Sequence, residues 1–115
     1  MRLVDGDKVT DNLLRAYAEI APEFSQYLVE FTFGDIYARE GDLKQRELVA
    51  IASLMTMGDC EVQLETHVHG AFNVGLSRQE IIEAAMTLIP YIGFPKVLNA
   101  LPIIKRVIEK RSPAT

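Results

Sequence analysis

The fold is decided by residues 43–74, which read LKQRELVAIASLMTMGDCEVQLETHVHGAFNV. Asp42 can cap a helix that begins here, and the second half of that helix is apolar on most sides. Gly58 is typical of the residue at which a helix ends. The pattern therefore predicts two helices, 43–57 and 60–74, joined by a tight turn, with the first helix central in the domain.

Two helices are predicted before this pair. Residues 1–9 lack helical periodicity and are expected to be extended, so the first helix is predicted to begin at a cap, Thr10 or Asp11, and to end near Glu19. A proline in the first turn starts the second helix, 22–41. Its apolar stripe consists of Phe24, Leu28, Phe31 and Ile36.

Two more helices are predicted after the pair. Ser77–Glu80 reads as a capping box that starts a helix ending near Ile92, and Pro90 is expected to bend or shorten its last turn. The last predicted helix covers 95–111, with a possible kink at Pro102. Since no segment alternates apolar and polar residues beside a hairpin turn, the chain is predicted to be all-α, with about six helices.

The composition fits one domain over residues 1–115. Hydrophobic residues make up 49 % of the chain, which is enough for one core and leaves apolar surface to bury against copies of the chain. The core is expected to cover about 22–110, and the ends, 1–9 and 112–115, are expected to be flexible.

The charge pattern argues against some classes of partner. Twelve basic and sixteen acidic residues give a net charge of −4, and the basic residues are scattered, so neither nucleic acid nor an anionic membrane is expected as a partner. Cys60 is the only cysteine, which excludes an intrachain disulfide. Without an apolar leader or a run of about 20 apolar residues, we expect a cytoplasmic protein.

Four residues form the candidate site. Cys60, Gln63 and His67 are spaced i, i+3 and i+7, which places them on one stripe of the predicted helix 60–74. The first turn of a helix favours a thiolate, and a histidine can exchange protons near neutral pH. If the helix pair is antiparallel, Glu47 can approach His67 across the turn.

Each of these residues also has a purely structural explanation. Cys60 can serve as a small apolar residue, Gln63 as a solvated or capping side chain, and His67 as a hydrogen-bonded core histidine. Glu47 suits the dipole in a first helical turn. His69 lies about 200° around the helix from His67, so the two histidines cannot share a metal ion on one face, and no metal site within one chain is expected.

The chain resembles the carboxymuconolactone decarboxylase family over about residues 22–110. The resembling stretches follow the family's order and spacing, and they are 43–52, HVHGA at 67–71, NVG at 73–75, EIIE at 80–83 and YIGFP at 91–95. The resemblance implies an all-helical, alkylhydroperoxidase D-like fold around a helical hairpin, assembled as a homotrimer or hexamer.

The resemblance implies two chemistries. In the decarboxylase branch, which uses neither metal nor organic cofactor, His67 would protonate a dienolate or orient a lactone. Our own hypothesis adds Glu47 as the residue that orients His67 and Arg46 as a group that attracts a substrate carboxylate, although a solvated surface role is the simpler explanation for Arg46. The alkylhydroperoxidase D branch uses a Cys-x-x-Cys-x-x-x-His motif. Here Cys60 falls on the first cysteine and Gln63 on the second, so the intramolecular disulfide of that mechanism cannot form.

Three hypotheses for function follow, in order of preference. The first is a cofactor-independent lyase that acts on a small lactone or carboxylic acid through His67 and Glu47. The second is a one-cysteine thiol peroxidase that uses Cys60 with His67 and an outside thiol. The third is an oligomeric binding protein without catalytic activity.

Overall fold

The computed structural model describes Val4 and residues 6–111, and within them all regular structure is helical. With α3 and η1 counted as one continuous helix, six helices are present, as predicted. In chain order they are α2 (Asp7–Ile20), α3 (Pro22–Tyr27), η1 (Leu28–Ile36), α4 (Leu43–Met57), α5 (Glu61–Asn73), α6 (Arg78–Ile92) and α7 (Phe94–Arg111).

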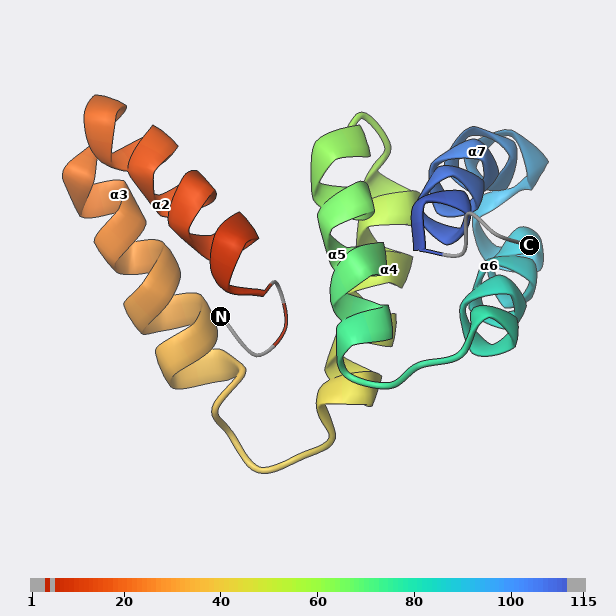
Figure 1. The fold of residues 1–115 in the computed structure, drawn as a ribbon. Helices are drawn as coiled ribbons and strands as arrows, with labels where there is room; N and C mark the ends of the chain where they lie inside the picture. Colours follow the sequence, from red (N-terminus) through yellow and green to blue (C-terminus); the bar gives the residue numbers. More distant parts are fainter. Residues whose placement is uncertain (1–3, 5, 112–115) are drawn as a thin grey trace.

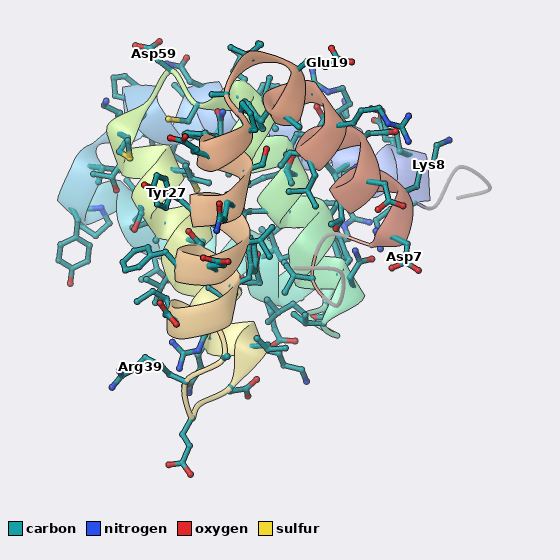
Figure 2. All side chains as sticks on the ribbon, turned by 90° about the vertical axis from the view of Figure 1, so that its left-hand side faces the viewer. Asp7, Lys8, Glu19, Tyr27, Arg39 and Asp59 are labelled. Atoms are coloured by element: carbon teal, nitrogen blue, oxygen red, sulfur yellow. The ribbon has the colours of Figure 1, made fainter. Side chains whose placement is uncertain are left out.

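The helices form two groups. α4 and α5 lie side by side, α7 packs on α5, and α6 packs on α7 and α4 (Figure 1). α2 packs against the continuous helix α3–η1 to make an N-terminal hairpin, which stands beside α5 and is joined to α4 by a loop. Viewed from the hairpin side, this hairpin lies in front of α4 and α5 (Figure 2). The fold is thus a four-helix unit with a helical hairpin against one side.

The hydrophobic core lies in the four-helix unit, because each of its helices directs apolar side chains inward. Those that are buried are Ile51 and Met55 of α4, Leu64, Val68 and Ala71 of α5, Leu76, Ile81 and Ala85 in and before α6, and Val97, Ala100, Ile103, Ile104 and Val107 of α7. α4 buries a narrower face than predicted, since Val49 is exposed.

Local signals explain where these helices begin and end. The Asp42 carboxylate accepts a hydrogen bond from the N–H of Lys44 and caps α4, and the predicted capping box of Ser77 and Glu80 is formed at the start of α6. Gly58 ends α4 with φ of 71°, a conformation that favours glycine. Asp59 also has a positive φ, so Cys60 rather than Asp59 is the N-cap of α5.

Several predicted boundaries are wrong. α2 begins at Asp7, so Thr10 is a buried residue inside the helix instead of its cap, and the expectation of an extended segment over 1–9 fails from Asp7 onward. Val4 is also buried, and the expected flexibility of the ends stays a prediction; residues 1–3, 5 and 112–115 lie outside the described residues.

The second predicted helix differs in form and in burial. From Leu28 it continues as a wider π-helix with i to i+5 hydrogen bonds, and it ends at Ile36, five residues before Gly41. Phe24, Phe31 and Ile36 of its apolar stripe are exposed, so the described chain covers this stripe only in part. Pro90 and Pro102 lie within helices that continue beyond them, so Pro90 does not shorten α6.

None of the helices that the structure describes is both long enough and apolar enough to cross a membrane.

The burial pattern predicts unequal effects of two substitutions in α7. Ile104→Ala removes a buried side chain from the core and should lower the free energy of unfolding by about 2–5 kcal/mol. Lys105→Ala, on the exposed side of the same helix, should change it by about 0.5 kcal/mol or less. Urea denaturation measures both values, and similar losses would contradict this assignment of the core.

Candidate functional site

The centre of the candidate site is a buried acid beside a histidine. Nδ1 of His67 in α5 lies 2.9 Å from Oε2 of Glu47 in α4. The Glu47 side chain is 0 % exposed and that of His67 is 21 % exposed. Because a carboxylate oxygen accepts, the contact places a proton on Nδ1 of His67 and fixes the plane of its ring. The predicted approach of these two residues is confirmed.

Helix geometry explains the pairing. Glu47 precedes Gly58 by eleven residues and His67 follows it by nine, so the two residues lie at similar heights on helices that run in opposite directions from the turn. Glu47 shares one face of α4 with Ile51 and Met55, which are core residues. The fold therefore buries a carboxylate next to the hydrophobic core and gives it one histidine as its neighbour in α5.

His67 also lines a cavity of about 230 Å³ between α5 and the N-terminal hairpin. From α5 the cavity receives Val62, Gln63, Thr66 and His67, and from the hairpin it receives Leu13, Tyr17, Phe24, Leu28 and Phe33. Most of this wall is apolar or aromatic. The cavity can hold a molecule with a single ring, and among the described residues that line it the imidazole of His67 is the one basic group.

The other predicted site residues are distributed differently. Gln63 lies with His67 on the cavity wall, as the helical spacing predicted. Cys60 lies outside the regular turns of α5 and lines a separate hollow of about 440 Å³, together with Lys96 and Asn99 of α7. Cys60 was expected to lie on the same side of the helix as His67. Because it is the N-cap of α5 and not part of its turns, it lines a different hollow.

Arg46 takes a structural role. Its guanidinium Nη2 donates to the backbone carbonyls of Arg39 and Glu40, at 3.0 and 2.9 Å, and so holds the loop that leads into α4. Arg46 does not line the cavity of His67. The expectation that it attracts a substrate carboxylate finds no support in this geometry.

Sequence reasoning missed the hairpin residues that wall the cavity, among them Tyr17, Phe24 and Phe33. Their helical spacing indicated only an amphipathic helix and could not show which face would meet α5. It also missed Gly70 and Asn73, although both fall in stretches that carry the family resemblance. Those stretches were the available signal, because a glycine and an asparagine in a helix interior are otherwise unfavourable.

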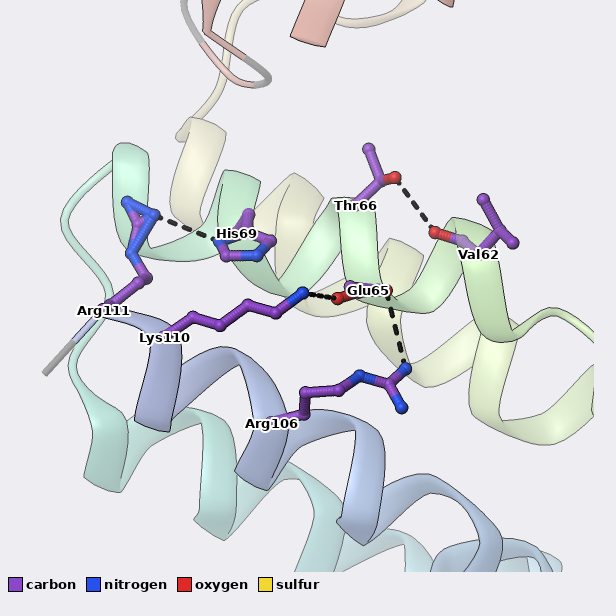
Figure 3. A network of polar contacts seen from close by, with 7 residues as sticks. All are labelled: Val62, Glu65, Thr66, His69, Arg106, Lys110 and Arg111. Atoms are coloured by element: carbon purple, nitrogen blue, oxygen red, sulfur yellow. Dashed lines mark hydrogen bonds and ion pairs between the residues drawn. The ribbon is translucent and has the colours of Figure 1, made fainter. Parts of the chain in front are cut away.

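The second histidine has different surroundings. Nδ1 of His69 lies 3.4 Å from Nη1 of Arg111 on the side of α5 that faces α7 (Figure 3). Partial burial and the charge of Arg111 both disfavour an imidazolium, so they lower the pKa of His69. Nearby, Lys110 and Arg106 hold Glu65, and the hydrogen bond from Lys110 lowers the pKa of that carboxyl. His67 and His69 thus belong to separate environments.

Comparison with known proteins identifies relatives. Residues 22–106 match the model of the carboxymuconolactone decarboxylase family. The chain is 27 % identical over 105 residues to a nitrosuccinic acid decarboxylase of Metarhizium robertsii, covering 90 % of this chain and 73 % of that protein. It has the same identity over 105 residues to a 4-carboxymuconolactone decarboxylase of Acinetobacter baylyi, covering 90 % and 78 %.

A third relative is a 15.0 kDa protein of Paracoccus denitrificans encoded between nqo9 and nqo10. It is 31 % identical over 96 residues, which are 82 % of this chain and 72 % of that protein. The chain belongs to the carboxymuconolactone decarboxylase family.

The surroundings of His69 predict its titration. We expect its imidazole to titrate below the ordinary value of about 6.5 in NMR spectra recorded against pH. Arg111→Gln removes a neighbouring positive charge and should raise the pKa of His69. Arg78→Gln, at the start of α6, is the control and should leave it unchanged. A midpoint that stays the same in Arg111→Gln would contradict the contribution of Arg111.

Proposed function

We propose that this member of the carboxymuconolactone decarboxylase family is a decarboxylase that acts on a small carboxylic acid or lactone acid without a metal or organic cofactor. The observation that carries the proposal is the buried Glu47 carboxylate 2.9 Å from His67, whose ring lines a cavity of suitable size. Two relatives named as decarboxylases support the same reaction class.

In the proposed reaction His67 is the proton donor. The bond between the substrate carbon and its carboxylate breaks, CO₂ leaves, and the electron pair passes into an adjacent carbonyl, nitro or unsaturated group of the substrate. The resulting carbanion equivalent takes a proton on carbon from Nε2 of an imidazolium at His67, which then regains a proton from water. Glu47 stabilises this imidazolium through Nδ1, in the way that an acid orients a catalytic histidine.

The cavity wall favours this reaction. Tyr17, Phe24 and Phe33 give the substrate an apolar environment, in which a carboxylate loses part of its hydration. Loss of CO₂ removes the localised charge, so an apolar wall destabilises the bound acid more than the delocalised transition state. The amide of Gln63 lies on the same wall and can hold a polar substituent of the ring.

No specific observation favours a one-cysteine peroxidase. A peroxidatic thiol that depends on His67 and Glu47 would need to lie in their cavity, whereas Cys60 lines the separate hollow beside α7. We therefore retain the lyase as the proposal, with a binding protein as the alternative outcome of its test.

We also propose that the chain forms a homo-oligomer, of which the trimer or hexamer implied by the family resemblance is the expected form. Its accessible surface is 7467 Å², whereas a compact monomer of 12.9 kDa exposes about 6,300 Å². The single chain thus leaves more surface accessible than a compact monomer of this mass, and part of it is available for an interface. Large apolar side chains lie on this surface, including Tyr27, Phe31, Tyr91, Phe94 and Leu98.

Substitution of the two histidines tests the reaction. His67→Ala should lower kcat for release of CO₂ from 4-carboxymuconolactone or nitrosuccinate by about 10²–10⁴-fold, because general acid catalysis is lost. His69→Ala is the matched control, two residues away on the other side of α5, and should retain activity. Cys60→Ser should also retain activity, since Cys60 lines a different hollow.

Two results would contradict the lyase. One is unchanged turnover in His67→Ala of every acid that the wild-type protein decarboxylates. The other is a wild-type protein that binds such acids in a thermal-shift assay but releases no CO₂, which would favour the binding protein.

Sedimentation tests the assembly. At micromolar concentration we expect a mass that is a multiple of 12.9 kDa, with three or six chains. Phe31→Asp places a charge on the exposed apolar face of the hairpin and should shift the protein toward smaller species. Lys105→Asp introduces the same side chain at an exposed charged position and serves as the control. A wild-type monomer would overturn the proposal.

A further inference from the structure

The segment before α2 reaches the buried side of the Glu47–His67 pair. Val4 is only 2 % exposed, although it lies outside α2 and far from the core helices in sequence. Its carbonyl oxygen accepts a hydrogen bond of 2.6 Å from Nδ2 of Asn73, at the last residue of α5. A single side chain thus fixes the start of the described chain to the end of the helix that carries His67.

Gly70 provides the space for this contact. A Cβ atom at position 70 would lie 2.6 Å from Cγ1 of Val4 and 3.2 Å from Oε2 of Glu47. The first of these distances is too short for two carbon atoms that are not bonded to each other, so only glycine allows Val4 to occupy its position. The same geometry shows that Val4 and the carboxylate of Glu47 converge on one point of α5, on the face next to His67.

Asn73 is itself held in place from α7. Its Oδ1 atom accepts from Nη2 of Arg111, whose guanidinium also lies over the ring of Phe72, 5.3 Å from its centroid. Since Oδ1 is used by a cation that can only donate, Nδ2 is directed to the carbonyl of Val4. Figure 3 shows the surroundings of Arg111, which anchors this part of α7 beside His69 on α5.

We propose that Val4 with Gly6 and Thr10, here named the N-terminal strap, excludes water from the carboxylate of Glu47, and that Asn73 and Gly70 are positioning residues for the acid–base pair. A hydrogen bond to a carboxylate is stronger where water is absent, so the closed strap holds the ring of His67 more firmly against Glu47. The catalytic part of this inference rests on the proposed lyase function, whereas the closure of the strap does not.

The first test removes the hydrogen bond between Asn73 and Val4 and leaves Glu47 and His67 unchanged. Asn73→Ala loses the donor to Val4, and Asn73 is exposed, so the fold should tolerate the change. In ¹⁵N-labelled protein the Nδ1–H proton of His67, assigned by its absence in His67→Gln, should exchange with water about tenfold faster, the size expected for one lost hydrogen bond. Asn99→Ala, an exposed asparagine of α7, is the control and should leave this exchange unchanged.

The second test introduces a steric clash with Val4 at position 70 and then removes it with a smaller residue at position 4. Gly70→Ala should displace Val4 and accelerate the same exchange, and the double variant Gly70→Ala with Val4→Ala should recover part of the protection, because the clashing methyl group is removed. A merely structural defect at position 70 would not respond to a smaller residue at position 4. If Gly70→Ala fails to fold, Asn73→Ala decides the question alone.

The kinetic constants of Asn73→Ala provide an independent test. In Asn73→Ala, kcat should fall by a factor similar to the gain in exchange while KM stays nearly constant, because the cavity wall is unchanged. An exchange rate in Asn73→Ala equal to that of the wild type would overturn the strap, even if the chain proves to be a decarboxylase. Faster exchange in a protein that releases no CO₂ would support the strap and refute the proposed function.

Discussion

The rest of the structure depends on a carboxylate placed where water does not reach. Glu47 is fully buried, and a charge in such a position is costly unless a hydrogen-bonding partner compensates for it. The compensation comes from His67 on the neighbouring helix, and it requires that α4 and α5 remain paired with the correct offset. The turn over residues 58–60, in which Gly58 has a positive φ, joins the two helices and so sets this offset and the geometry of the site.

Much of the four-helix unit could be predicted because its signals are local. The cap at Asp42, the capping box at Ser77–Glu80 and the glycine at the end of α4 act on neighbouring backbone groups, so sequence alone identifies them. The approach of Glu47 to His67 was also accessible, because it follows from counting residues on either side of a tight turn. Both predictions use only the rise of a helix and the chemistry of its ends.

The features that could not be predicted depend on backbone geometry or on contacts between residues far apart in the sequence. Cys60 satisfied the helical spacing, but two successive residues with positive φ moved the start of α5 by one position and turned Cys60 toward α7. The apolar stripe of the second helix was visible, yet its spacing could not show that Phe31 and Ile36 would be exposed in the folded chain. The contact between Val4 and Asn73 spans 69 residues, which no periodicity can reveal.

The two halves of the site have separate origins, and this separation has a consequence for specificity. Glu47 and His67 are held by α4 and α5, which share the core, whereas Tyr17, Phe24 and Phe33 come from a hairpin that packs mainly on itself. A substitution in the hairpin can therefore alter the shape of the cavity without disturbing the contact between Glu47 and His67. Since most substitutions outside a core cost little stability, such changes are easily tolerated. A fold divided in this way can keep the Glu47–His67 pair unchanged while the cavity beside it changes shape.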